Sequence, residues 1–490
     1  MSSHDDTIRS LSDATEAALT AEGFRTELEP AARQQLATLS NAPDAAGLRD
    51  LRALLWSSVD NAESKDLDQI EFAEALADGA VRLLVGIADV DALVTKDSPL
   101  DLHAKTNATS VYAGVTVYPM LPSEISTGAT SLNEGAERAV VVVELVIEPD
   151  GTTRSHALYR ALAVNRAKLA YDSVGAWLEG RAARPAEVAA HDGLEAQLWL
   201  QDRIASLLKG VRVRAGALSF DTVEARPVVA NGKVESLAVT RRNRARDLIE
   251  DFMIAANVAA AQFLAEQKRS AIRRVVREPR RWPRIVEIAA GYGISLPGAP
   301  SAPALAEFLA ARRAADPTRF PDLSLSIVKL LGPGKYVLDR TGPDDDQGHF
   351  GLAAHDYAHA TAPNRRYADL VTQRLLKAAI AGAPAPYTDD ELTVIAALCT
   401  ERENAANRVE RIARKSAAAL LLADRIGQPF DAIVTGASKD GTYVRLLSPP
   451  AEGRVIRGEQ GMDVGERVCV RLVGVDSARG RIDFETCEGQ

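Results

Sequence analysis

The first 55 residues alternate polar and apolar positions with a helical period. Apolar side chains recur every three or four positions in three segments, which Gly23 and the stretch 41–44 separate. This spacing predicts three short amphipathic helices, over residues 8–23, 29–41 and 46–58. We therefore expect a helical N-terminal domain over residues 1–55. It is either a helix-turn-helix or a helical extension packed on the next domain.

From about residue 56 the pattern changes to strands and long helices. Residues 81–90 and 140–148 are apolar runs rich in valine, isoleucine and leucine, which predict strands. Longer amphipathic segments predict helices over residues 244–267, 365–381 and 388–426. Strands and helices in separate blocks are typical of the α+β class. We place this α+β catalytic domain at residues 56–426.

The chain beyond Gly427 has a third pattern. About five short apolar runs are separated by glycine-centred turns. This size and rhythm predict an OB-fold barrel over residues 427–490. Such barrels commonly hold single-stranded nucleic acid, and a barrel used only for packing is the alternative.

The composition is that of an ordinary globular protein, with 46% hydrophobic and 26% charged residues. The cysteines Cys399, Cys469 and Cys487 form no C-x-x-C pair, which argues against a zinc ribbon or a disulfide framework and fits a reducing cytosol. The N-terminus lacks a signal-peptide pattern, and the apolar runs are shorter than a membrane span. We expect a cytoplasmic monomer with no membrane contact.

Two basic segments stand out in a chain whose net charge is −9. Residues 268–284 hold eight Lys or Arg in seventeen positions, and Arg408, Arg411, Arg414 and Lys415 form a second series. An acidic protein repels nucleic acid at long range, but local patches decide binding. Each segment is either a solvated helix face or part of a groove that follows phosphates.

The segment 60–69 crowds three carboxylates, from Asp60, Asp66 and Asp68. Crowded carboxylates repel one another, and a divalent cation with oxygen ligands relieves that repulsion. Asp66 and Asp68 share a face only where the backbone is extended. A solvated acidic turn is the common explanation of an isolated D-x-D, so the choice depends on the rest of the chain.

The segment 357–370 holds two adjacent arginines, Arg365 and Arg366. Pro363 is suited to the first turn of a helix, so we expect both arginines near free backbone N–H groups, where anions bind. The planar guanidinium fork grips phosphate oxygens. Adjacent helical residues point about 100° apart, so the two arginines must have different roles.

Four motifs now stand in one order along the chain. They are the D-x5-D-x-D cluster from Asp60, TSVY and MLP within 109–122, E-x-x-M-x-x-A-N at 250–257, and Y-x-H-x-T-x-P-x-R-R-Y-A-D at 357–369. With the C-terminal barrel, this order resembles the RNase II (RNB) family of processive 3′→5′ exoribonucleases. The resemblance implies hydrolysis of single-stranded RNA to nucleoside 5′-monophosphates, in RNA decay or processing.

The resemblance also implies a metal centre. Asp60, Asp66 and Asp68 match the family's metal-binding aspartates, which hold one or two Mg²⁺ ions, and Asp68 is expected to be essential for catalysis. Arg365 matches the arginine that stabilises charge in the transition state. Gln69 stands where the family commonly has a further aspartate. Its amide oxygen can coordinate a metal but brings no charge.

The substrate-binding positions follow in the same way. Tyr112 matches the tyrosine that positions the 3′-terminal nucleotide, and Tyr171 the aromatic that stacks on bases and limits the final product. Glu250 matches the glutamate beneath the terminal nucleotides, and Arg366 is expected to bind substrate. Taken singly, each would be an ordinary core or surface residue.

Two further departures concern the loop before the arginines and the N-terminus. The family's Ser-Pro-Ile is Ala-Pro-Asn at residues 362–364, which loses a hydroxyl. Only 59 residues precede Asp60, too few for a pair of cold-shock barrels, so we expect a shortened form. We hypothesise that its helical N-terminus helps to admit structured RNA.

Two rival functions remain open. Gln69 favours a non-catalytic RNA-binding homologue. His355 and Asp356, with His359 one turn on, resemble the HD pair of other metal phosphohydrolases. That match is short, and a second pair, at 191–192, lies far upstream in a loop-like stretch.

Overall fold

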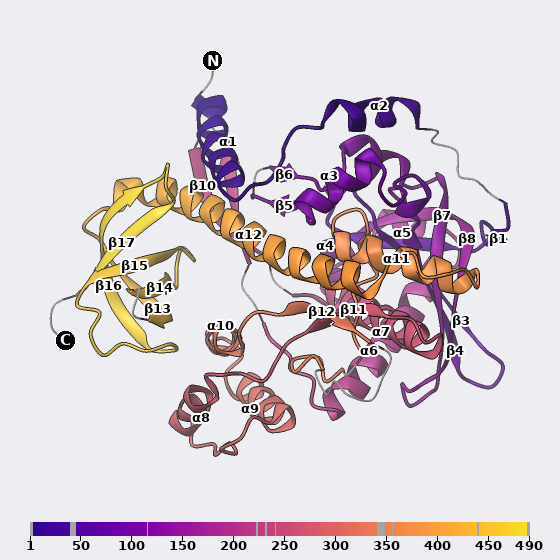
Figure 1. Ribbon diagram of the computed structural model, residues 1–490. Coiled ribbons are helices and arrows are strands. Elements are labelled where there is room, and N and C mark those ends of the chain that lie inside the picture. Colours follow the sequence, from indigo (N-terminus) through magenta and orange to yellow (C-terminus); the bar gives the residue numbers. More distant parts are fainter. Residues whose placement is uncertain are drawn as a thin grey trace.

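The structure is a computed structural model (Figure 1). It describes residues 3–39, 46–114, 116–221, 224–230, 233–240, 242–340, 348–354, 356–438 and 441–487. A mixed body of strands and helices occupies one side of the molecule, and a small barrel occupies the other. One long helix runs between them (Figure 1).

A curled sheet forms the centre of the larger body. Its strands are β1 (Arg49–Asp50), β2 (Trp56–Asp60), β3 (Gln69–Ala75), β4 (Val81–Ala88), β7 (Glu137–Ile147) and β8 (Thr153–Ala170). They are ordered β1-β8-β2-β3-β4-β7. The long strand β8 pairs antiparallel with β7 along its first part and parallel with β2 along its last part. The sheet therefore closes on itself through β8.

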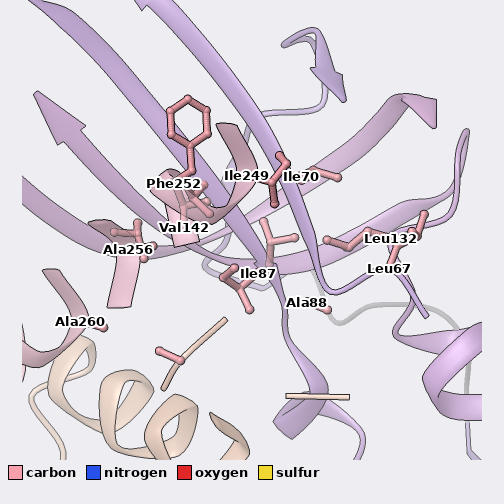
Figure 2. Packing of buried hydrophobic residues seen from close by; sticks show 14 of the residues in the cluster. Leu67, Ile70, Ile87, Ala88, Leu132, Val142, Ile249, Phe252, Ala256 and Ala260 are labelled. Carbon is pink, nitrogen blue, oxygen red and sulfur yellow. The ribbon is translucent and has the colours of Figure 1, made fainter. Parts of the chain in front are cut away.

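The helix that the sequence predicts over 244–267 is α7 (Arg244–Glu266), and it packs on this sheet. Asn243 caps it by accepting the backbone N–H of Arg246. Ile249 and Phe252 belong to the same buried cluster as Ile70 of β3 (Figure 2). By length and composition α7 could cross a membrane, but most of its apolar stretch is buried within the protein.

The other elements of this body are shorter. Helices and helical turns are α3 (Pro99–Asn107), α4 (Tyr171–Leu178), α5 (Ala186–Ala189), α6 (Leu194–Arg214), α8 (Trp282–Gly291), α9 (Ala302–Ala315), α10 (Phe320–Leu331), α11 (Tyr367–Ile380), η1 (Val90–Ala92), η2 (Glu124–Ala129) and η3 (Ala423–Arg425). Two-stranded antiparallel pairs are β5 (Val111–Tyr112) with β6 (Val117–Tyr118), β9 (Glu224–Ala230) with β10 (Lys233–Thr240), and β11 (Ala271–Val275) with β12 (Lys335–Asp339).

The long helix α12 (Asp389–Leu422) leads to the barrel (Figure 1). A capping box of Thr388 and Glu391 begins it, because each side chain accepts an N–H that the first turn leaves free. It ends at Leu422, where the turn η3 follows, four residues before the end that the sequence predicts at residue 426.

The C-terminal barrel has the five strands that the sequence predicts. They are β13 (Pro429–Ser438), β14 (Gly441–Leu446), β15 (Glu452–Arg457), β16 (Arg467–Asp476) and β17 (Arg481–Thr486), closed in the order β13-β14-β15-β17-β16. One expectation is wrong here, since Cys469 of β16 and Cys487 form a disulfide. The two lie on adjacent antiparallel segments, a proximity that sequence spacing does not reveal.

The N-terminal segment holds two of the three expected helices. Helix α1 (Ser3–Ala21) packs against α12, and α2 (Pro30–Thr38) packs against α3. The helix expected over 46–58 is wrong, because this stretch contributes β1 and β2 to the sheet. Pairing with β8 overrides local helix propensity there. The α+β class with N-terminal helices and a C-terminal barrel is otherwise confirmed.

The basic segment 268–284 is not a solvated helix face. It forms β11 and the start of α8, and several of its arginines pair with carboxylates. Arg273 lies 2.7 Å from Asp356, and Arg274 donates to Glu403 over 2.8 Å. In the second basic series, Arg408 pairs with Glu22 at 2.6 Å. Much of this positive charge is therefore neutralised within the protein.

Candidate active site

The acidic segment forms the connection between β2 and β3. Asp60 ends β2, and its Oδ1 accepts the N–H of Asn61 and the hydroxyl of Ser64, over 2.6 and 3.0 Å. Leu67 is fully buried in the sheet cluster (Figure 2). Its N–H donates to Ser131 Oγ over 3.0 Å. Leu67 thus anchors the loop at a point between Asp66 and Asp68.

Asp68 is the most deeply buried of the three aspartates, with 2% of its surface exposed. Its Oδ1 accepts the backbone N–H of Asn364 over 3.0 Å, and its Oδ2 lies 3.4 Å from Arg365 Nε. Burial raises the pKa of Asp68 to about 7, although the positive charge of Arg365 opposes that shift. Oδ2 makes no hydrogen bond within the described residues, so this oxygen can still accept a further ligand.

The loop that carries Arg365 is held by Asp369 in the first turn of α11. Asp369 Oδ1 accepts the N–H groups of Thr361 and Ala362, over 2.9 and 2.8 Å, and lies 2.8 Å from Arg366 Nη2. The helix begins only at Tyr367, so the expectation that both arginines lie in its first turns is wrong. The buried carboxylate shapes this loop together with the bonds that the N–H groups of Arg365 and Arg366 donate to the carbonyl of Ala362, over 3.2 and 3.0 Å.

The two arginines differ in their surroundings, as expected. The Arg365 side chain is 43% exposed beside Asp68, whereas the Arg366 side chain is 24% exposed and paired with Asp369. Arg365 is therefore the arginine that a ligand can reach. The substrate-binding role assigned to Arg366 remains a prediction.

Backbone hydrogen bonds join the loop to the segment that contains Tyr112. Ser110 N–H donates to the carbonyl of Arg365 over 3.0 Å, and Tyr367 N–H donates to that of Ala108 over 2.8 Å. Tyr112 is 39% exposed. Its hydroxyl donates to Asp66 Oδ2 over 3.2 Å. Tyr112 thus lies between the acidic loop and open surface.

Tyr171 borders the same site from the first turn of α4. The guanidinium of Arg246 lies 4.4 Å from its ring centre, and Arg246 Nη2 donates to Asn61 Oδ1 over 3.0 Å. Burial, then the charges of Asp60 and Glu71, raise the pKa of Tyr171. This ring therefore lies beside the acidic loop.

Glu250 lies further along α7, with its side chain 46% exposed. It accepts a hydrogen bond from Arg242. Its role beneath terminal nucleotides remains a prediction.

Sequence reasoning missed several residues of this site. Asn364 is fully buried and accepts the hydroxyl of Thr130 over 2.6 Å, so the amide gives the loop a different polar anchor. Arg246 gives no signal in the sequence, because its partners are far away in the chain. Glu71 does give a signal in the sequence, because it is a charged residue inside an apolar strand.

No three His, Cys, Asp or Glu side chains within the described ranges are gathered closely enough to form a complete metal cage. Mg²⁺ often takes only one or two carboxylates from the protein and completes its shell with water and phosphate. The unpartnered buried oxygens of Asp68 and Glu71 are the kind of group that such an ion satisfies. The residues present therefore fit a divalent cation.

The rival metal site finds no support from its described members. Asp356 pairs with Arg273, and His359 Nδ1 lies 2.8 Å from the Tyr336 hydroxyl. Burial, then the charge of Arg366, lowers the pKa of His359 well below its usual value. His355 lies outside the described residues.

Comparison with known proteins identifies the family. The profile of the RNB domain matches residues 48–382, and that of the RNase II-type exonuclease C-terminal S1 domain matches residues 428–486. The chain belongs to the RNB family. Nucleases of the RNB family are metal-dependent, and the family predicted from the four motifs is confirmed.

Curated relatives match nearly the whole chain. Ribonuclease R of Escherichia coli is 30% identical over 494 residues, covering 93% of this chain and 59% of that protein. Ribonuclease R 1 of Lactococcus lactis is 29% identical, covering 90% and 56%. Exoribonuclease 2 of Edwardsiella piscicida is 34% identical, covering 89% and 66%. The chain thus spans somewhat more than half the length of the ribonuclease R proteins.

Solved structures share the RNB fold. Mycoplasma genitalium RNase R, in complex with ribose-methylated single-stranded RNA, matches with a TM-score of 0.84 and 23% identity, covering 96% of this chain and 77% of that one. Yeast Ssd1, described as a pseudonuclease, matches with a TM-score of 0.71 and 18% identity, covering 95% and 59%.

Proposed function

We propose that this protein is a Mg²⁺-dependent 3′→5′ exoribonuclease that processively hydrolyses single-stranded RNA to nucleoside 5′-monophosphates. The observation that carries this proposal is the junction of Asp68 and Arg365. It places a half-paired buried carboxylate beside a guanidinium that a ligand can reach.

Asp60, Asp66 and Asp68 would hold one or two Mg²⁺ ions, with the Gln69 amide as a neutral neighbour. The chemistry that a bound magnesium ion supplies is Lewis-acid activation of water and of the scissile phosphate. The hydrogen bond from Asn364 fixes Asp68 for this task. Burial raises the pKa of Asp68, but the charge of Arg365 opposes that rise and so favours the ionised form that binds a cation.

Arg365 would donate to phosphate oxygens whose negative charge increases during cleavage. Such preorganised donors act most strongly where water is excluded. Tyr112 would orient the 3′-terminal nucleotide, because its hydroxyl contacts Asp66 while its ring is partly exposed.

Three further side chains would contact RNA. Tyr171 would stack on a base with Arg246 on its ring, and Glu250 and Arg366 would line the path of the terminal nucleotides. The C-terminal barrel would add a groove for single-stranded RNA. We also propose that the protein acts as a cytoplasmic monomer.

A non-catalytic RNA-binding protein is the second candidate, favoured by two observations. Gln69 replaces an acidic residue of the family, and a described pseudonuclease shares the fold. The intact Asp60, Asp66, Asp68 and Arg365 favour the enzyme.

The test is incubation of 5′-labelled single-stranded RNA with the full chain and Mg²⁺. We expect a ladder that shortens from the 3′ end, nucleoside 5′-monophosphates as products, and no reaction in EDTA. Intact RNA that remains tightly bound would support the second candidate. Fractionation of native cells and light scattering of the purified protein test the location and the monomeric state.

A further inference from the structure

Glu71 is a buried acid without a partner. None of its surface is exposed, and neither carboxylate oxygen has a hydrogen-bond partner among the residues that the structure describes. An unpaired charge in the interior costs several kcal/mol. Buried charges are therefore normally paired or bound to a metal. A buried glutamate therefore either takes up a proton or is held next to a positive charge.

The strand places Glu71 on the same face as Gln69. Side chains alternate along β3, and Ile70 between them belongs to the cluster on α7 (Figure 2). Two residues along a strand span about 7 Å, which the longer side chain of glutamate partly bridges.

Glu71 lies close to Asp60 of the candidate metal site. Ser57 of β2 pairs directly with Glu71 in register, and its buried hydroxyl also has no hydrogen-bond partner within the described part of the chain. The charges of Asp60 and Glu71 act on each other and on Tyr171. Arg246 donates to Asn61 and does not pair with either oxygen of Glu71.

We propose that Glu71 supplies, on the Asp60 side of the metal centre, the negative charge that Gln69 does not bring. This inference rests on the proposed metal-dependent function. The acidic group has moved two positions along β3, on the same face of the strand. A divalent cation would in turn satisfy the two free oxygens of Glu71.

The test measures Mn²⁺ binding to the full-length protein by calorimetry, without RNA and without turnover. Glu71→Gln keeps the shape of the side chain and removes its charge. We expect the affinity to fall roughly 10- to 100-fold, the range found when supporting groups of a metal site are lost. Glu74→Gln is the matched control on the same strand, since Glu74 pairs with Arg82 at 2.7 Å. It should bind Mn²⁺ as the wild type does.

A second readout is thermal stability. In EDTA, Glu71→Gln should melt at a higher temperature than the wild type, because it removes an unpaired buried carboxylate. Adding Mn²⁺ should raise its melting temperature less than that of the wild type. Glu71→Leu, which also removes the charge, serves as a second variant should Glu71→Gln not fold.

The rescue variant combines Glu71→Gln with Gln69→Asp. We expect it to regain most of the lost Mn²⁺ affinity, because the charge returns to the same face. Wild-type affinity in Glu71→Gln, or no gain in the double variant, would overturn the inference. Asp68→Asn distinguishes a failure of the proposed metal site from a failure of the proposed role of Glu71. If it too binds Mn²⁺ normally, the proposed metal site itself fails. If only Asp68→Asn weakens binding, the role of Glu71 alone fails.

Discussion

The backbone N–H of Asn364 donates to Oδ1 of Asp68 over 3.0 Å. This bond connects the acidic loop between β2 and β3 to the loop that carries Arg365, although the two residues are 296 positions apart. It fixes one carboxylate oxygen and leaves the other beside Arg365. The geometry of the site therefore depends on the junction of these two loops.

Asp68→Asn should abolish turnover while the protein still binds RNA. The amide keeps an oxygen for the Asn364 N–H but loses the charge that a cation requires. Metal ions supply several kcal/mol of transition-state stabilisation, so the rate should fall about 10³-fold or more. RNA affinity should stay within about threefold, since phosphate contacts along the chain dominate it. Single-turnover assays and filter binding measure the two quantities, and a parallel loss of both would indicate a structural role.

Arg365→Lys should slow catalysis with little effect on stability. Lysine lacks the planar fork that reaches two phosphate oxygens, and loss of one preorganised donor costs about 10²–10³ in rate. Arg366→Lys is the comparison, because Arg366 is paired with Asp369. It should lower the free energy of unfolding, as measured in urea. If Arg365→Lys lowered stability and Arg366→Lys slowed catalysis instead, the roles assigned to the two arginines would be reversed.

Acid should destabilise the fold partly through His349. Burial, with the nearby charge of Arg274, lowers the pKa of His349 to about 4, and its Nδ1 accepts the N–H of Leu352 over 3.1 Å. The unfolded chain takes up this proton near pH 6.5. The free energy of unfolding should therefore fall as the pH drops below that value, by about 1–2 kcal/mol between pH 7 and pH 5.

His349→Asn is the control for that prediction, because it keeps an acceptor for Leu352 but does not titrate. Urea unfolding at the two pH values should show a smaller loss of stability in the variant. Equal losses in both proteins would exclude His349 as the source.

Tyr171→Ala should lengthen the shortest RNA that remains at the end of the reaction. Stacking of a base on an aromatic ring is worth about 1–3 kcal/mol, so without the ring short RNAs dissociate before the last cleavages. Tyr171→Phe keeps the ring and should leave the end product unchanged. Denaturing gels resolve the product lengths. An unchanged end product in the alanine variant would remove Tyr171 from the path of the RNA.

The fold was largely predictable because most of its signals are local. The apolar run of β4 and the amphipathic period of α7 identify these elements without reference to the rest of the chain. The stretch 46–58 fails for the opposite reason, because its strands exist through pairing with β8. The start of α11 fails likewise, since Asp369 shapes the preceding loop.

The candidate site was predictable where motif order carries information. The order of Asp68, Tyr112 and Arg365 identified the family. The disulfide of Cys469 could not be foreseen, because strand register decides which cysteines meet. The lack of a hydrogen-bond partner for Glu71 among the described residues could not be foreseen either, because it depends on the folded structure.

The most direct test of the central claim is a crystal structure of the full chain with Mn²⁺ and a short RNA, in which anomalous scattering locates the ions. We predict at least one ion bound between Asp60 and Asp68, the 3′-terminal phosphodiester beside it, and Arg365 on a phosphate oxygen. An RNA 3′ end or an ion bound away from Asp68 would contradict the account.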